Sequence, residues 1–247
     1  MRHDQGMAKM TLRTLVSTLL AGLLAASASH AAPAAFEDTM AQRTLACTAC
    51  HGQAGRAAGT VYYPRIAGKP AGYLYHQLLN FRDNRRHYAL MTQLLDPLSD
   101  AYLLEIAQHF AQLDLPYPPP QPSNAAPAVL RHGQTLATQG DAARHIPACT
   151  QCHGTALTGV APNTPGLLGL PRDYLNAQLG AWRTGQRRAH APDCMNAVAR
   201  QLSPADVNAV THWLAAQPLP AQPQAATAWP ALPPGAKAIA CGSAPQP

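Results

Sequence analysis

The chain has 247 residues, and its 18 lysines and arginines exceed its 12 aspartates and glutamates, giving a formal net charge of +6. This length allows one large domain or two small ones. No basic run is interleaved with aromatic residues, which argues against a nucleic-acid-binding protein.

The N-terminus has the pattern of an export signal. Three basic residues precede an uncharged run rich in leucine and alanine, Thr14–Ala31, which ends in the small-residue sequence "SHA". This order of charge, apolar run and small residues predicts a signal peptide over residues 1–31, cleaved after Ala31, and therefore a periplasmic protein. An uncleaved anchor stays open as the alternative, because Thr14–Phe36 carries no charge and is long enough to span a bilayer. A peripheral association with the membrane is also compatible with this pattern.

The rest of the chain contains a long internal repeat. The string "CTACHG" at Cys47 recurs as "CTQCHG" at Cys149, and "PRIAGKPAGYLYHQLLNFR" recurs as "PGLLGLPRDYLNAQLGAWR". The identical pairs within the longer strings are Pro64 and Pro165, Gly68 and Gly169, Pro70 and Pro171, Tyr73 and Tyr174, Leu74 and Leu175, Gln77 and Gln178, Leu78 and Leu179, and Arg82 and Arg183. A repeat of this length predicts two homologous domains. We assign them to residues 32–114 and 128–218.

Each repeat is predicted to be helical. Pro70 and Pro171 suit the first turn of helices that continue to Arg82 and Arg183. Ser99 and Ser203 have the residue type and position of N-caps for the last helix of each repeat. No stretch alternates convincingly with a period of two. The sequence therefore predicts an all-α fold of two small domains, whose cores are marginal without a prosthetic group.

Two proline-rich segments lie outside the repeat. Residues 115–127, "LPYPPPQPSNAAP", are predicted to form an extended, semi-rigid and exposed linker between the domains. Residues 219–247 form a proline-rich C-terminal tail.

The C-x-x-C-H motif that opens each repeat is the signature of covalent c-type haem attachment. Two thiols three residues apart reach the two vinyl groups of one porphyrin edge, and the following histidine then lies under the ring to bind the iron. Thioether bonds are predicted from Cys47, Cys50, Cys149 and Cys152, with His51 and His153 as iron ligands. The sequence thus predicts two covalently bound haem c groups.

A C-x-x-C pair has three other common uses in proteins. A thioredoxin-like dithiol needs a βαβ context, and a structural zinc site needs four ligands, whereas neither repeat offers a second pair of cysteines. A disulfide within each pair is the third use. Two motifs at equivalent places in a repeated, exported chain favour haem over all three.

The sixth iron ligand separates electron carriers from haem enzymes, because an open position lets iron bind small molecules. Met91 and Met195 occupy matching places before "LSD" and "LSP", in segments that we expect to be loops. His87 and His190 are rival ligands, but their offsets from the methionines differ. We predict methionine ligation of both irons, which favours electron transfer at a relatively high potential.

Each half resembles a class I cytochrome c domain, through C-x-x-C-H, the "P-x-x-x-G" loop, the "Y-x-x-x-Q-L" helix, the methionine and "L-S-D". Over about Thr39 to Gln217, the tandem resembles the dihaem cytochrome c4 family. The resemblance implies two domains packed face to face with haem propionates near their interface. It also implies that the carbonyls of Pro64 and Pro165 orient the two histidines. The implied function is periplasmic electron transfer between redox proteins such as a terminal oxidase, a quinol-oxidising complex or a dehydrogenase.

Two features depart from that pattern. Cys194 and Cys241 are not needed for haem, and we hypothesise a disulfide that ties the tail over the second methionine segment; unpaired thiols and an intermolecular bridge are the alternatives. The basic pairs at the ends of the repeated helices, Arg85 with Arg86 and Arg187 with Arg188, suit an acidic partner, haem propionates or ordinary solvated helix ends.

The sequence as a whole predicts an outer-sphere electron carrier with no catalytic residue of its own. One alternative is an electron-transfer subunit of a membrane dehydrogenase complex. Another is a dihaem peroxidase or sulfur-compound oxidase with one open haem, for which the second domain is the candidate.

Overall fold

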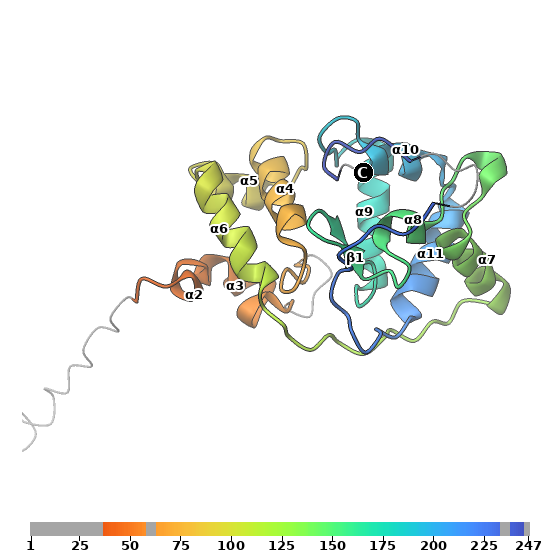
Figure 1. The fold of residues 1–247 in the computed structure, drawn as a ribbon, viewed down its shortest axis with the longest axis horizontal. Helices are drawn as coiled ribbons and strands as arrows, with labels where there is room; N and C mark the ends of the chain where they lie inside the picture. Colours follow the sequence, from red (N-terminus) through yellow and green to blue (C-terminus); the bar gives the residue numbers. More distant parts are fainter. Residues whose placement is uncertain (1–36, 58–62, 233–237, 245–247) are drawn as a thin grey trace, which may run out of the picture. The chain divides into compact units, whose positions relative to one another are not determined.

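The structure is a computed structural model that describes residues 37–57, 63–232 and 238–244, so the predicted signal peptide lies outside the described residues. Both repeats belong to one compact unit that begins at Thr39 (Figure 1). The elements of the first repeat are α2 (Met40–Arg43), α3 (Leu45–His51), the short 3-10 helix η1 (Gln53–Gly55), α4 (Ala71–Arg82), α5 (Ala89–Leu95) and α6 (Asp100–Ala111).

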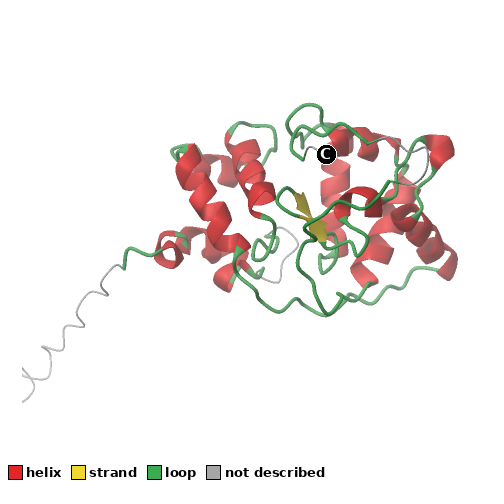
Figure 2. Cartoon of the chain, viewed as in Figure 1, coloured by secondary structure: helices red, strands yellow, loops and turns green. Residues whose placement is uncertain are grey.

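The second repeat follows the same order with additions. Its elements are α7 (Pro127–Thr138), η2 (Ala142–Arg144), α8 (Cys149–His153), β1 (Gly159–Val160), β2 (Thr164–Pro165), α9 (Arg172–Thr184), α10 (Cys194–Gln201) and α11 (Pro204–Ala216). Strands β1 and β2 pair antiparallel, with Val160 opposite Thr164, and are the only strands in the described part of the chain (Figure 2). The predicted all-α fold class is confirmed.

Serine caps fix where the last helix of each repeat begins. The Ser99 hydroxyl accepts a hydrogen bond from the Tyr102 amide at 3.2 Å, and the Ser203 hydroxyl accepts one from the Asp206 amide at 3.1 Å. Asp206 also accepts a hydrogen bond from the Ser203 amide, which completes a capping box. These contacts satisfy amide groups that the helix itself leaves unbonded.

The prolines of the repeated helices sit one position earlier than predicted. Pro70 and Pro171 are the N-caps of α4 and α9, which begin at Ala71 and Arg172. Pro70 has φ −52° and ψ 135°, so its ring presets φ while its ψ is extended. The prolines therefore mark the helix starts from just outside the first turn.

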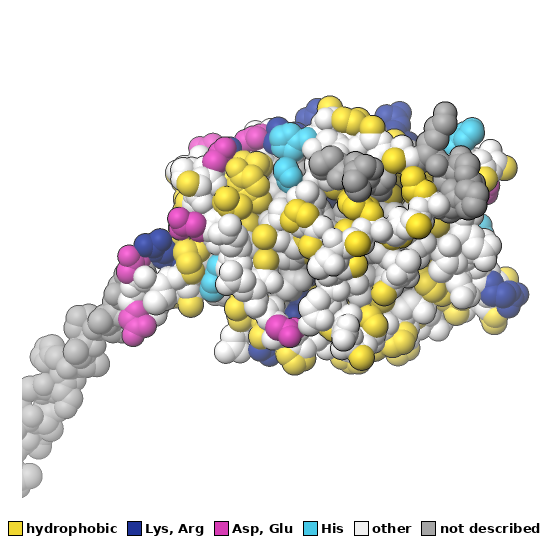
Figure 3. Space-filling view, viewed as in Figure 1, with side chains coloured by type: hydrophobic (Ala, Val, Ile, Leu, Met, Phe, Trp, Pro, Cys, Tyr) yellow, Lys and Arg dark blue, Asp and Glu magenta, His cyan; other side chains and the backbone are white. Residues whose placement is uncertain are grey.

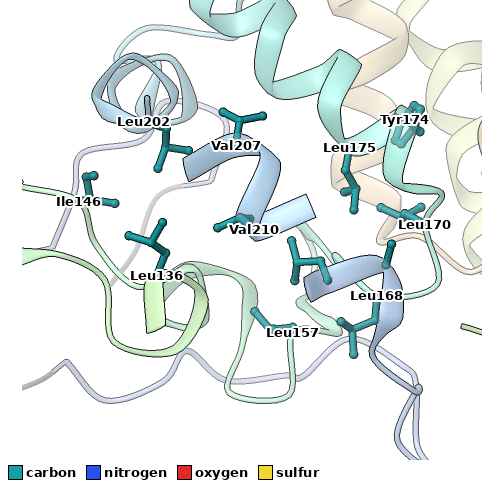
Figure 4. Close-up of a cluster of buried hydrophobic side chains, with 12 residues drawn as sticks. Leu136, Ile146, Leu157, Leu168, Leu170, Tyr174, Leu175, Leu202, Val207 and Val210 are labelled. Atoms are coloured by element: carbon teal, nitrogen blue, oxygen red, sulfur yellow. The ribbon is translucent and has the colours of Figure 1, made fainter. Parts of the chain in front are cut away.

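Each repeat has its own apolar core. In the first, leucines of α4 and α5 pack with Leu103, Ile106 and Phe110 of α6. In the second, residues of α7, α9 and α11 pack together with loop leucines, and Figure 4 shows these side chains directed toward a common space. Separate cores are what two homologous domains require, although the domain limits stay predictions.

The proline-rich segments are anchored at a few points. The Arg65 guanidinium donates to the carbonyl oxygens of Leu115 and Pro116, and the Gln121 amide donates to the Ala215 carbonyl. Farther along, the Ala226 amide donates to Gly159, so the tail runs beside β1. The linker is extended, as its composition predicts, but α7 already begins at Pro127. Within the described ranges, no helix has both the length and the apolarity needed to cross a membrane.

Candidate functional site

The C-x-x-C-H motifs lie on short helices that end at their histidines. α3 ends at His51 and α8 ends at His153. Residues at i, i+3 and i+4 share one helix face, so both thiols and the imidazole of each motif point to the same side. Gly52 and Gly154 follow with φ of 75° and 82°, a conformation that favours glycine and ends each helix at that point.

Both histidines are buried and held by a backbone carbonyl. Nδ1 of His51 lies 2.8 Å from the Pro64 oxygen, and Nδ1 of His153 lies 2.7 Å from the Pro165 oxygen. A carbonyl only accepts, so Nδ1 carries the proton and Nε2 is left as the metal-binding nitrogen. Burial lowers the pKa of both rings, which keeps them neutral, as a metal ligand must be. This is the contact that the resemblance implies.

The rival uses of the cysteine pairs find little support. In residues 37–57, 63–232 and 238–244, none of the four motif cysteines takes part in a disulfide. Burial raises the pKa of Cys47, and raises that of Cys149 to about 11, whereas a redox dithiol needs a lowered value. No group of three or more His, Cys, Asp or Glu suited to a metal ion occurs in the same ranges. A structural zinc site therefore lacks ligands there.

In the second repeat the predicted haem residues surround one cavity. Cys149, Cys152, His153 and Met195 all line it, and most of the remaining wall is apolar. Trp182 adds a polar group to the wall, because its buried Nε1 finds no acceptor among the described residues. An apolar wall, two thiols, a neutral imidazole, a thioether and an unsatisfied donor fit a haem, which has an apolar ring and carboxylates that accept hydrogen bonds.

In the first repeat the matching residues lie around the apolar core. Cys47 and Met91 both pack against it, while Pro64 holds His51. Met91 lies in α5 and Met195 lies in the first turn of α10, so the expectation that both methionines sit in loops was wrong. In α10 the Asp193 side chain accepts from the Asn196 amide at 3.0 Å and starts a helix that the methionine spacing alone does not reveal.

The rival histidine ligands lie elsewhere. His87 is exposed, and its backbone amide donates to the Gln186 carbonyl. Nε2 of His190 lies 3.2 Å from Nη2 of Arg85, and its ring packs edge-on against His76. Neither histidine is among the residues that line the cavity of the second repeat.

Arg86 and Arg187 form an arginine–glutamine cluster with Gln77 and Gln178. Arg86 donates to Gln77 at 3.1 Å and to Gln178 at 2.8 Å, and Arg187 donates to Gln178 at 2.7 Å and to Gln77 at 2.9 Å. The two arginines also pair as an antiparallel bridge, and Arg187 is only 4% exposed. Solvated helix ends were the wrong interpretation for these two residues, since each reaches the other repeat.

Arg85 and Arg188 also contact the other repeat but lie nearer the surface than Arg187. The Arg85 side chain pairs with Asp83 at 2.7 Å, besides its contact with His190. Arg188 is exposed; its side chain donates to the Asn84 carbonyl at 3.4 Å and its amide donates to the Arg85 carbonyl.

Gln77 and Gln178 were not predicted from the sequence to be residues that connect the two repeats. Their identity at matching positions of the repeat was the one indication in the sequence.

The two remaining cysteines are joined. Cys194 and Cys241 form a disulfide with an S–S distance of 2.01 Å. Cys194 is the first residue of α10 and adjoins Met195, and the Gly242 amide donates to the Pro192 carbonyl at 2.9 Å. The tail is thereby fastened beside the segment that carries the second methionine.

Comparison with known proteins places this geometry among haem proteins. The Cytochrome c family model matches residues 130–217. The chain is 40% identical to the thiosulfate dehydrogenase electron acceptor of Thiomonas intermedia (strain K12), over 76% of this chain and 86% of that protein. It is 31% identical to cytochrome c4 of Pseudomonas aeruginosa, over 84% of this chain and 98% of that protein.

Solved structures agree with these relatives. Reduced recombinant cytochrome c4 from Pseudomonas stutzeri superposes with a TM-score of 0.61 at 30% identity, over 72% of this chain and 96% of that chain. Thiosulfate dehydrogenase (TsdBA) from Marichromatium purpuratum gives a TM-score of 0.62 at 31% identity, over 70% of this chain. Only 36% of that longer chain is covered, so the similarity concerns a part of it.

Proposed function

Because this chain belongs to the dihaem cytochrome c4 family, whose members are electron-transfer cytochromes with covalently bound haem c, we propose that it accepts electrons from a thiosulfate-oxidising dehydrogenase and passes them to a further redox protein. It has no substrate reaction of its own. The observation that carries the proposal is the cavity at which Cys149, Cys152, His153 and Met195 meet.

Each of these residues has a distinct role in the proposal. Cys47, Cys50, Cys149 and Cys152 would form the thioether bonds that hold the two haems. His51 and His153 would bind iron through Nε2, since Pro64 and Pro165 occupy Nδ1. Met91 and Met195 would supply the second protein ligand of each iron. When bound, each haem provides an iron that gains and loses one electron, and two protein ligands keep small molecules from that iron.

The donor is proposed from a relative. The thiosulfate dehydrogenase electron acceptor of Thiomonas intermedia shares 40% of its residues with this chain over 86% of its length. Its name describes a protein that takes up electrons from a partner enzyme. The haem site proposed here would let this chain take up electrons in the same way. The acceptor is then a downstream redox protein, such as a terminal oxidase, and the exchange takes place in the periplasm.

A direct test mixes the oxidised, haem-loaded protein with thiosulfate, first alone and then with a purified thiosulfate dehydrogenase. We expect no reduction by thiosulfate alone and reduction of both haems when the dehydrogenase is present, followed by absorbance. Ascorbate, which reduces without a partner, measures the full amplitude. Turnover of thiosulfate without the dehydrogenase would overturn the carrier assignment. Failure of the dehydrogenase to reduce either haem would overturn the donor assignment.

A further inference from the structure

Lys69 is a buried cation that faces the cavity of the opposite repeat. It lies in the loop before α4 of the first repeat and is 5% exposed. Together with Arg65 it lines the same cavity as Cys149, His153 and Met195, which belong to the second repeat. A residue of one repeat thus contributes to the wall of the other repeat's haem site.

Arg65 and Lys69 differ in the number of hydrogen bonds that their charged groups make. The Arg65 guanidinium donates to the carbonyls of Ala67, Leu115 and Pro116 and lies 3.9 Å from the centroid of the Tyr117 ring. The Lys69 ammonium lies 5.6 Å from that ring centroid and makes no hydrogen bond or ion pair with the residues that the structure describes. Neither cation has an anionic partner among the described residues, but only Lys69 also lacks a hydrogen-bond acceptor there.

A buried ammonium without a partner is costly, because burial removes its hydration. Burial lowers the pKa of Lys69 to about 8, and the nearby charge of Arg65 acts in the same direction. An anion in the cavity would stabilise the charged form. The wall of this cavity also includes Trp182, whose buried Nε1 has no acceptor among the described residues, and Arg187, whose guanidinium lies 3.8 Å from the centroid of the Trp182 ring.

The two repeats differ at this position. Lys69 follows Gly68, and the residue that follows the matching Gly169 is Leu170, which is buried and apolar. Arg65 follows Pro64, and the residue after the matching Pro165 is Gly166. The charges therefore exist in one copy of the loop only, so the repeat symmetry of the chain is broken beside the haem sites.

We propose that Lys69 binds a propionate carboxylate of the haem held by the second repeat and makes that haem easier to reduce than it would be without this charge. A cation near the iron stabilises the reduced form, which carries one positive charge less than the oxidised form. Lys69 is a positioning residue, acting through the carboxylate. The inference depends on the proposed haem site of the second repeat and adds to it a contact from the first.

The test compares Lys69→Gln and Lys69→Leu with wild type in a spectroscopic redox titration of the haem-loaded protein. Leucine is the residue of the other repeat, so the two neutral variants cover both a polar and an apolar replacement. The two haems are assigned by NMR of their methyl groups in the oxidised state. We expect the ratio of reduced to oxidised second haem, at a fixed potential, to fall about tenfold, with a smaller change at the first haem.

Two controls sharpen the comparison. Lys69→Arg keeps the charge and is expected to retain most of the wild-type potential. Arg188→Gln removes an exposed charge and is expected to change both haems little. Infrared difference spectra of protein with labelled propionates provide a second measurement, in which the neutral variants shift a carboxylate band.

The inference is overturned if both neutral variants leave the second potential and the carboxylate band unchanged, or if Arg188→Gln has the same effect. It is also overturned if added phosphate or sulfate changes the wild-type potential but not that of Lys69→Gln, because a free anion would then occupy the site. Haem content and the methionine charge-transfer band of wild type are measured in the same samples. Their absence would contradict the proposed function itself, which keeps the two failures distinct.

Discussion

At the scale of single residues, the two proposed methionine ligands would decide what the irons can do. Met91 is partly buried against the first core, and Met195 lines the cavity of the second repeat. A thioether ligand on each iron would leave no open position for small molecules and would raise the potential. If both methionines are ligands, each accounts for half of the ferric methionine charge-transfer band.

Met91→Ala and Met195→Ala are each expected to halve that band and to let one reduced haem bind carbon monoxide, whereas wild type binds none. Absorbance spectra of the oxidised and the carbon monoxide-treated reduced protein provide the measurement. Met40 is a matched control, since it too packs partly buried against the first core but lies in α2. A wild-type protein that binds carbon monoxide at the second haem would instead favour the open-haem alternative.

At the scale of elements, the start of α11 holds one buried carboxylate. Asp206, whose side chain is 3% exposed, accepts hydrogen bonds from Arg144 and His132, both at 2.7 Å, and from the amide and hydroxyl of Ser203. Arg144 and His132 come from η2 and α7, so one carboxylate joins three elements of the second repeat. Because the side chains of Arg144 and His132 are themselves 40% and 46% exposed, water solvates them when the carboxylate is removed, and the loss is that of the hydrogen bonds to Asp206.

Asp206→Ala is therefore expected to lower the free energy of unfolding by about 2 kcal/mol, because it removes half of the capping box and the hydrogen bonds to a charged acceptor. Denaturant titration followed by far-UV circular dichroism measures it. Asp100→Asn is the control, because Asp100 occupies the first turn of α6 but its side chain is 66% exposed. Equal losses in the two variants would show that the network of Asp206 adds nothing beyond an ordinary acidic first turn.

The same carboxylate predicts a pH dependence. Burial alone would raise the pKa of Asp206, but hydrogen bonds from Arg144, His132 and Ser203 hold it well below its usual range. A lowered folded-state pKa stabilises the fold above the unfolded value, about 3.9, and this contribution is lost as the pH falls. The difference in stability between wild type and Asp206→Ala should thus shrink steadily below about pH 4. A constant difference down to pH 2 would contradict this assignment.

The disulfide that fastens the C-terminal tail is also expected to contribute to the free energy of unfolding. The disulfide joins residues 47 positions apart, and closing a loop of this length stabilises by about 4 kcal/mol in the chain-entropy description. Cys194→Ser with Cys241→Ser should lower the free energy of unfolding by up to that amount, and a reducing agent should do the same to wild type but not to the variant. If reductant destabilises both proteins equally, the effect does not come from this disulfide.

At this scale, the sequence predicts well those features that depend on residues close together in the chain. Ser99 and Ser203 cap the helices they were expected to cap, because an N-cap depends on a few neighbouring residues. The repeat likewise predicts two copies of one helical order. The burial of Arg187 was not predicted, since a basic pair at a helix end has the same local pattern whether it meets water or another repeat. Lys69 was overlooked because a lysine in a loop likewise has the same local pattern whether it is exposed or buried against another repeat.

At the scale of the whole molecule, charged side chains are few in the sequence, yet several cationic side chains are buried. Charged residues make up 12% of the sequence, and the face in Figure 3 is covered mostly by hydrophobic and uncharged side chains. Arg65, Lys69 and Arg187 are nevertheless buried, and none has a carboxylate within ion-pair distance in the described part of the chain. Haem propionates are anions that a haem c would bring, so we expect the stability of the chain to depend on haem loading.

The arginine–glutamine cluster makes the coupling of the two repeats testable. The oxygen of each glutamine accepts hydrogen bonds from both arginines, one in each repeat. Replacing the glutamines therefore leaves the buried Arg187 and the half-buried Arg86 short of acceptors. Gln77→Ala with Gln178→Ala should therefore separate unfolding into two transitions, where wild type shows one. Circular dichroism and Soret absorbance, followed in the same denaturant titration, distinguish the cases.

Gln108→Ala, an exposed glutamine of α6, controls for a generic loss of side chain. If wild type itself unfolds in two steps, the cluster does not couple the repeats thermodynamically, and each haem domain folds on its own. If the double variant still unfolds in one step, coupling must come from the haems and from cations such as Lys69. The two outcomes separate contacts of the polypeptide from contacts through the prosthetic groups, which is the distinction on which electronic communication between the haems depends.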